Sequence, residues 1–165
     1  MAEIYVSLGS NINQRHYIKA AVKALRNQYG SVTLSPVYES IAMGFAGDNF
    51  YNLVAQFNTI QTITDVTQQL TAIENANDRE RNGPRFGPRT LDIDLLLYDD
   101  LIINNDQLQL PRKEIAKYAF VLRPLTDIAS QRIDPVLKKT YQELWEKLDT
   151  TNQPLWQIPF DFDTP

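Results

Sequence analysis

The spacing of apolar positions predicts a chain of alternating strands and helices. Alternating or continuous apolar residues predict strands over residues 4–8, 32–38, 51–60 and 91–98, and a short hairpin over 101–110. Apolar residues at helical spacing predict helices over residues 15–29, 65–77, 120–129 and 141–148. Residues 9–11 are expected to form a turn, and residues 41–49, with Gly44 and Gly47, a loop.

The predicted order of the first elements is strand, helix, strand, strand, helix, strand. This order is typical of a ferredoxin-like α+β sandwich, in which helices flank an antiparallel-rich sheet. With 165 residues, the chain is expected to form a single domain over 1–165, with a peripheral tail from about residue 150. The fold alone does not indicate a function, because this topology supports many unrelated activities.

Two carboxylates interrupt the apolar strand that ends at Tyr98. Alternation predicts Leu91, Ile93, Leu95 and Leu97 on one face and Asp92, Asp94, Leu96 and Tyr98 on the other. Residues two apart in a strand are roughly 6.5–7 Å apart at Cα, so both carboxylates can reach one cation or a close pair of cations. Magnesium favours such oxygen ligands together with waters and substrate phosphates. The alternative is a structural pair neutralised by nearby arginines.

A basic loop leads directly into this strand. Arg79, Arg81, Arg85 and Arg89 lie in a segment punctuated by Gly-Pro at 83–84 and 87–88. The planar guanidinium group suits phosphate because it donates two parallel hydrogen bonds and stays charged. Phosphate ligands and cation ligands are therefore adjacent in sequence, as a magnesium–nucleotide site requires. A solvated basic loop is the alternative interpretation.

Composition excludes several other classes. A net charge of −4 argues against a general nucleic-acid binder, and the absence of cysteine excludes disulfides and thiolate metal sites. The single histidine, His16, has no neighbours that would suit a hydrolase triad or a zinc site. No signal peptide or membrane span is indicated, so a cytoplasmic location without membrane or nucleic-acid partners is expected.

Four segments of the chain form a recognisable set: V-S-L-G-S-N-I near the start, Y-N-L-V-A from Tyr51, R-F-G-P-R-T-L-D-I-D-L-L-L from Arg85, and A-F-V-L-R-P-L-T-D-I-A from Ala119. These segments resemble the 6-hydroxymethyl-7,8-dihydropterin pyrophosphokinase family of folate biosynthesis. They occur in family order over roughly residues 4–129. The resemblance implies transfer of pyrophosphate from ATP to the pterin hydroxymethyl group, with release of AMP and use of two Mg²⁺ ions, by an enzyme expected to be a monomer.

The resemblance also implies roles for individual residues. The catalytic set matched to the family is Arg79, Arg89, Asp92 and Asp94, and the two aspartates are the metal ligands. The set expected at the nucleotide is Glu74, Arg81, Arg85, Phe86, Leu95, Gln109, Arg112 and Tyr118. The set expected at the pterin is Ser40, Ile41, Met43, Phe50, Asn52 and Phe120. Without the resemblance, core packing would be the preferred interpretation of Phe50 and Phe120.

Several positions depart from the family pattern. Arg112 stands where the family usually has histidine, Tyr118 where it has arginine, Phe86 where it often has tryptophan, and Ile41 where it has proline. Arg112 keeps a cation near the phosphates, whereas Tyr118 cannot supply one. A catalytically weakened or substrate-shifted paralogue is therefore an alternative. An oligonucleotide-binding module is a remote alternative, and a sugar-nucleotide transferase is disfavoured by the short chain and the interior position of the aspartates.

Overall fold

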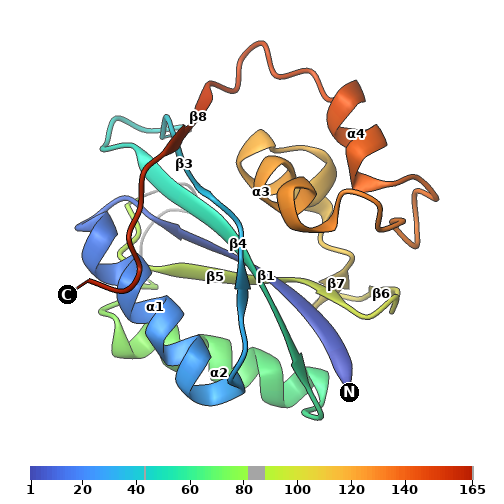
Figure 1. Ribbon diagram of the computed structural model, residues 1–165, viewed down its shortest axis with the longest axis horizontal. Helices are drawn as coiled ribbons and strands as arrows, with labels where there is room; N and C mark the ends of the chain where they lie inside the picture. Colours follow the sequence, from blue (N-terminus) through green and yellow to red (C-terminus); the bar gives the residue numbers. More distant parts are fainter. Residues whose placement is uncertain (43, 82–87, 165) are drawn as a thin grey trace.

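The computed structural model describes residues 1–42, 44–81 and 88–164, which form one main sheet covered on both faces by helices (Figure 1). The strands of this sheet are β1 (Ala2–Ser10), β2 (Thr33–Leu34), β3 (Val37–Ser40), β4 (Phe50–Thr59), β5 (Asp92–Tyr98) and β8 (Leu155–Ile158). A separate hairpin comprises β6 (Ile103–Asn104) and β7 (Gln109–Leu110). The helices are α1 (Gln14–Tyr29), α2 (Ile63–Ala76), α3 (Ala119–Ala129) and α4 (Tyr141–Lys147), with a 3-10 helix at η1 (Lys113–Ala116). The α+β class is confirmed.

The strand order is β5-β1-β4-β3-β8, and the pairings along it are antiparallel. Its first four strands have the order of a ferredoxin-like sheet, with the first and third strands of that motif in the centre. Helices α1 and α2 lie on one face and α3 and α4 on the other (Figure 1). Among the described residues, no helix is both long and apolar enough to cross a membrane.

Each face of the sheet has its own apolar core. On the α1/α2 face, Ile4, Val6 and Leu53 pack with Val22 and Val66. This arrangement follows from the sequence, because the helical spacing of the apolar positions gives each helix one buried stripe. The core on the α3/α4 face includes Tyr5, Val54, Leu96, Leu122 and Tyr141.

A β-bulge changes the predicted faces at the end of β5. Tyr5 pairs with Leu97 and Val6 with Leu95, so Leu96 is an extra residue without a partner on β1. Leu96 and Leu97 consequently both pack on the α3/α4 face, whereas Tyr98 packs on the α1/α2 face. The predicted placement of Leu97 with Leu95, and of Tyr98 with the aspartates, is therefore wrong, because strict alternation does not survive a bulge.

Two other predicted boundaries also differ from the structure. The predicted strand over residues 32–38 is divided into β2 and β3 at Ser35 and Pro36, because proline has no N–H to contribute to the ladder. The Ser35 hydroxyl accepts a hydrogen bond from the Val54 N–H at 2.9 Å there. Gly9 and Ser10, expected in a turn, continue β1, and the chain leaves the strand only at Asn11.

The C-terminal segment packs back onto the domain. Strand β8 pairs with the outer edge of β3, and the chain then runs beside α1, as Figure 1 shows. There the Phe160 ring lies 6.4 Å from that of Tyr51, and the Arg15 guanidinium carbon lies 5.3 Å from the Phe160 ring centre. Lys19 Nζ also donates to the Thr164 carbonyl at 2.6 Å. The tail thus lies at the edge of the sheet and is attached along its length.

The stacked pair Tyr29–Phe57 allows a test of the α1/α2 core. Phe57 is fully buried, and its ring lies 4.0 Å from that of Tyr29. We expect Phe57→Ala to lower the free energy of unfolding by about 3–5 kcal/mol, because it leaves a large cavity. Denaturant titration would measure this change, with Ile60→Ala as control. Ile60 is 87% exposed, so its replacement should change stability by no more than about 0.5 kcal/mol. Equal effects of the two substitutions would contradict the described packing.

Candidate functional site

A cavity of about 330 Å³ lies beside strands β1, β3, β4 and β5, with η1 and the start of α3 on its other side. Its volume is within the range of small-molecule sites, roughly 300–1,000 Å³. Eleven of the site residues predicted from the sequence line it together: Ser40, Ile41, Phe50, Asn52, Arg79, Arg89, Asp92, Asp94, Arg112, Tyr118 and Phe120. The cavity therefore unites positions that are up to 80 residues apart in the chain.

The alternation of β5 directs its two carboxylates into this cavity. Ile93 and Leu95 point into the α1/α2 core, so Asp92 and Asp94 project from the opposite face. Their partners on β1 are Gly9 and Ser7, both of which also line the cavity. These small residues leave room in front of the carboxylates.

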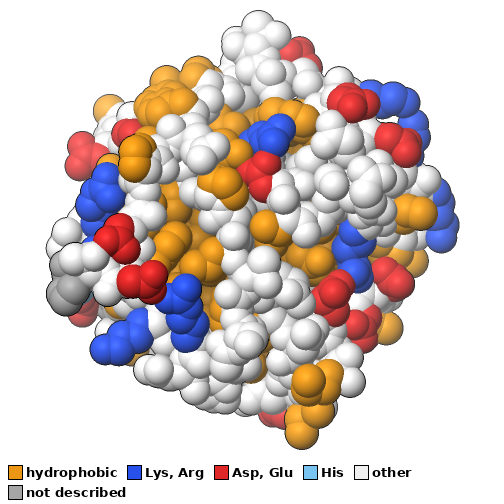
Figure 2. All heavy atoms as spheres, viewed as in Figure 1, with side chains coloured by type: hydrophobic (Ala, Val, Ile, Leu, Met, Phe, Trp, Pro, Cys, Tyr) orange, Lys and Arg blue, Asp and Glu red, His pale blue; other side chains and the backbone are white. Residues whose placement is uncertain are grey.

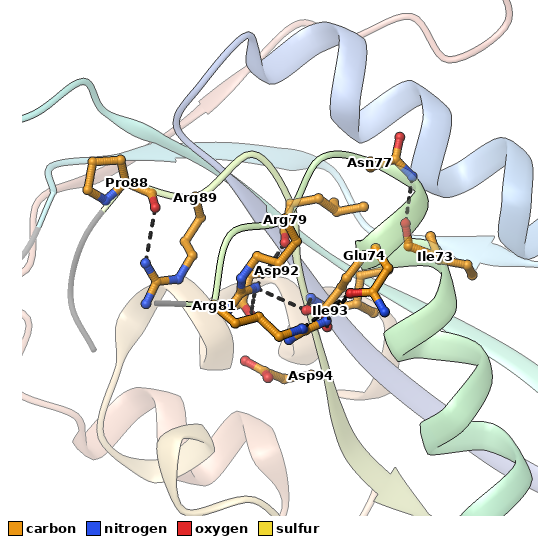
Figure 3. A network of polar contacts seen from close by, with 12 residues as sticks. Ile73, Glu74, Asn77, Arg79, Arg81, Pro88, Arg89, Asp92, Ile93 and Asp94 are labelled. Carbon is orange, nitrogen blue, oxygen red and sulfur yellow. Dashed lines mark hydrogen bonds and ion pairs between the residues drawn. The ribbon is translucent and has the colours of Figure 1, made fainter. Parts of the chain in front are cut away.

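Asp92 belongs to a charged network centred on Glu74 (Figure 3). Arg79 Nη1 donates to Asp92 Oδ1 at 2.8 Å, to Glu74 Oε2 at 3.1 Å and to the Leu91 carbonyl at 2.9 Å. Glu74 also accepts from Arg81 Nη2 at 3.0 Å and from the Ile93 N–H at 2.9 Å. Burial raises the pKa of the Glu74 carboxyl, although these hydrogen bonds oppose the shift. The network fixes Arg79 beside the first aspartate.

Asp94 experiences a different environment. The Arg112 guanidinium nitrogen Nη2 lies 3.4 Å from Asp94 Oδ1, and Arg112 Nε lies 3.1 Å from Glu114 Oε2. Burial and the nearby charge of Asp92 raise the pKa of Asp94 to about 7, against the opposing effect of Arg112. The second aspartate is therefore a carboxylate whose negative charge is incompletely compensated by the protein, which is the electrostatic condition that favours cation binding.

Asn11 connects the two loops that border the cavity. Its Oδ1 accepts from the Arg89 N–H at 2.7 Å, and its backbone N–H donates to the Arg89 carbonyl at 3.0 Å. Its Nδ2 donates to the Asp48 carbonyl at 3.2 Å. Asn11 itself is only 2% exposed, so its side chain is largely shielded from bulk water. The asparagine of the S-L-G-S-N segment thus fixes the backbone that carries Arg89 relative to the β3–β4 loop.

The other end of the cavity is aromatic. Phe50 and Phe120 both line it, and the Tyr118 ring stacks on that of Phe120 with 5.2 Å between centroids. Asn52 is buried, and its Nδ2 donates to the Ser40 hydroxyl at 2.8 Å. A flat heteroaromatic ligand needs such aromatic faces and an amide at its edge. The site therefore has one charged end and one aromatic end.

Four residues predicted to contact the nucleotide do not line the cavity. Glu74 is buried in its network, and Arg81 contacts Glu74 and Asn75. The Leu95 side chain lies in the core on the opposite face of the sheet. Gln109 belongs to the β6–β7 hairpin. Three other predicted positions, Met43, Arg85 and Phe86, lie outside the described residues.

Sequence reasoning missed several residues at the site. Phe45 lines the cavity from the β3–β4 loop, with its ring 6.4 Å from that of Phe50 at 88°. Its position next to Gly44 and two residues before Gly47 was a possible signal, because a lone aromatic in a glycine-containing loop needs a partner. Glu114 also lines the cavity, and nothing in its local sequence distinguishes it from a surface residue.

Comparison with known proteins identifies the chain's relatives. The model of the family described as 7,8-dihydro-6-hydroxymethylpterin-pyrophosphokinase (HPPK) matches residues 5–130. The chain is 34% identical over 145 residues to the 2-amino-4-hydroxy-6-hydroxymethyldihydropteridine pyrophosphokinase of Aquifex aeolicus, covering 87% of this chain and 90% of the relative. It is 38% identical over 130 residues to the protein of the same name from Pseudomonas aeruginosa, covering 76% and 80%.

The fold also matches solved structures. A Plasmodium falciparum HPPK-DHPS triple mutant superposes with a TM-score of 0.72 at 15% identity, over 88% of this chain. The chain spans 44% of that solved chain's length. At this identity the likeness supports the fold alone.

The raised pKa of Asp94 predicts how pH affects the stability of the metal-free protein. The pKa of Asp94 is about 7 in the folded state and about 4 in the unfolded chain, so between these pH values only the folded state keeps the carboxyl proton. Ionisation of Asp94 therefore destabilises the fold as pH rises from about 4 to about 7. We expect Asp94→Asn to remove that loss, so its melting temperature should exceed that of the wild type by more at pH 8 than at pH 5. Thermal unfolding with a chelator present would measure both differences. A difference independent of pH would contradict the electrostatic assignment.

Proposed function

The chain belongs to the 7,8-dihydro-6-hydroxymethylpterin-pyrophosphokinase (HPPK) family, and we propose how its residues carry out the reaction of that family. The protein transfers a pyrophosphoryl group to the hydroxymethyl group of hydroxymethyldihydropterin in folate synthesis, with ATP as the donor. The observation that supports this function best is the convergence of arginines, two carboxylates of one strand, an amide and four aromatic rings in one cavity.

The carboxylate pair fits magnesium. Within the described residues, no group of three or more histidine, cysteine or acidic side chains is arranged to hold a metal. Two carboxylates are nevertheless sufficient for Mg²⁺, which keeps several waters and takes further oxygens from substrate phosphates. The raised pKa of Asp94 supports this fit, since it reflects burial of the carboxyl together with the nearby charge of Asp92, and Arg112 offsets these effects only in part. When bound, two ions would neutralise phosphate charge and lower the pKa of the attacking hydroxyl.

The arginines would hold the triphosphate at the charged end of the cavity. Arg79 is fixed by Glu74 and Asp92, so its position is set before the nucleotide binds. Arg89 and Arg112 line the same end. In the reaction, the pterin hydroxymethyl oxygen bonds to the β-phosphorus while the bond from that phosphorus to the α–β bridging oxygen breaks, releasing AMP. Fixed positive charges stabilise the negative charge that develops on the bridging oxygen.

The aromatic end would bind the pterin. Phe50 and Phe120 would contact its two faces, and Asn52 would form hydrogen bonds with its edge. Asn52 is pre-oriented by its bond to Ser40, which lowers the cost of ordering it on binding. A monomeric state remains an expectation from the family resemblance, and a cytoplasmic location remains an expectation from the lack of a signal peptide or membrane span in the sequence.

The direct test of this function is AMP formation from ATP and 6-hydroxymethyl-7,8-dihydropterin. We expect AMP and pterin diphosphate in equal amounts, with loss of both products when the metal is chelated and recovery when Mg²⁺ is restored. ATP and pterin binding should be measured in parallel by calorimetry. Folded protein that binds both ligands but forms no AMP would support a weakened paralogue, and Arg112→His and Tyr118→Arg would then be the reversions to make.

The role of the first aspartate can be tested by Asp92→Asn. The amide oxygen can still accept the hydrogen bond from Arg79, so the fold should be kept while a metal ligand is lost. We expect kcat to fall by about a hundredfold or more, together with weaker Mg²⁺ binding measured by calorimetry. The control is Asp100→Asn, which removes a carboxylate that is outside the cavity and 79% exposed. Turnover close to that of the wild type would exclude Asp92 as a metal ligand.

Arg89→Ala tests charge stabilisation at the phosphates. Removing one such donor is expected to lower kcat by about a hundredfold, with a smaller change in the KM for the pterin. Steady-state kinetics would separate these parameters, with Arg26→Ala as a control that does not line the cavity. A loss below about tenfold, or ~1.4 kcal/mol, would assign Arg89 a structural role.

A further inference from the structure

The C-terminal strand lies outside the family match and yet pairs with β3, a strand that lines the cavity. The match ends at residue 130, whereas β8 is formed by Leu155–Ile158. Four residue pairs join β8 to β3: Val37 with Ile158, Tyr38 with Gln157, Glu39 with Trp156, and Ser40 with Leu155. The last of these pairs includes Ser40, which lines the cavity and holds Asn52. The tail strand β8 therefore pairs with β3 at Ser40, the residue that β3 contributes to the cavity.

A side-chain link extends this support beyond the strand. The Trp156 indole Nε1 donates to Glu39 Oε1 at 3.3 Å, and Asn49 Nδ2 donates to Glu39 Oε2 at 3.0 Å. Glu39 precedes the β3–β4 loop and Asn49 ends it. The carboxylate thus connects the two ends of the loop to each other and to the tail. The loop contains Phe45 and leads into Phe50, both of which line the aromatic end of the cavity.

We propose that β8, acting through the Trp156–Glu39–Asn49 link, positions the β3–β4 loop for pterin binding. Trp156 and Glu39 are positioning residues, because neither lines the cavity. A loop whose ends are held together loses less conformational freedom when a ligand binds, so the link should favour pterin affinity over the rate of transfer. The inference rests on the proposed placement of the pterin at this end.

Trp156→Phe removes the indole N–H and keeps an aromatic ring at the position. We expect the Kd for the pterin, measured by calorimetry with a non-hydrolysable ATP analogue, to rise roughly two- to tenfold, the equivalent of one net hydrogen bond. The KM for ATP and kcat should stay within about twofold of the wild type. Glu39→Ala, which loses both bonds, should have the larger effect, and Glu39→Gln, which keeps an acceptor oxygen, should recover part of it.

The matched control is Arg26→Gln. It breaks the ion pair between Arg26 and Asp163, 3.3 Å long, which attaches the tail to α1 without involving Glu39. This variant should leave the pterin Kd unchanged. Amide hydrogen exchange of the ligand-free proteins gives a second readout that does not depend on the reaction. Exchange at residues 44–49 should be faster in Trp156→Phe than in the wild type or Arg26→Gln, with β1 and β4 unchanged.

The two hypotheses fail in different ways. If the wild type makes AMP but Trp156→Phe and Glu39→Ala leave the pterin Kd and loop exchange unchanged, the link has no positioning role. If Trp156→Phe weakens ATP and pterin binding equally and speeds exchange throughout the sheet, Trp156 is merely structural and the inference is wrong. If the wild type makes no pterin-dependent AMP, the proposed function fails, and loop exchange still decides whether the link holds the loop.

Discussion

The buried carboxylate of Glu74 is the constraint on which the charged half of the site depends. Removing a carboxylate from water is costly unless it is paired and hydrogen-bonded, and Glu74, 5% exposed, accepts from two arginines and a backbone N–H. These donors come from β5 and from the segment after α2, whereas Glu74 itself lies in α2. The hydrogen bonds of this one carboxylate therefore fix all three parts of the chain relative to one another. The Arg79 side chain is thereby held in the one conformation that contacts Asp92, which is the pre-organisation that electrostatic catalysis requires.

The negative charges of the two aspartates are compensated to different extents by neighbouring arginines. Asp92 is neutralised through Arg79, while Asp94 shares Arg112 with Glu114. The surroundings of Asp94 therefore disfavour its ionised form, and a bound cation would stabilise that form. If this pair binds magnesium as proposed, the unliganded fold would be less stable and the site would have a higher affinity for the cation, a compromise common at functional sites. On the face shown in Figure 2, positive and negative side chains are otherwise interspersed, so a strong charge imbalance is not a general property of this surface.

The sequence predicted the sheet, its helices and most of the cavity, because these depend on periodic apolar positions and on local motifs. Asp92 and Asp94 could be placed on one face since alternation holds up to Leu95. The predicted alternation fails at Leu97, because the bulge at Leu96 depends on pairing with β1 and has no local signature. Strand β8 was missed for a similar reason: its four residues have little pattern of their own and become a strand only against β3. Asn11 acts through hydrogen bonds to Arg89 and Asp48, which are distant in the chain, and residue spacing cannot show such contacts.

Strand β8 also determines how much of the sheet remains open to other chains. An uncovered β3 would present unpaired backbone groups next to the cavity, and such edges template association between molecules. With β8 in place, β8 itself forms the edge of the sheet. This edge is short, because Pro154 and Pro159 flank the strand and neither can donate a backbone hydrogen bond. A partner chain could pair with only a few residues before meeting a proline. The segment proposed to position the β3–β4 loop would thus also limit self-association, so loss of the tail would be expected to reduce solubility at high protein concentration.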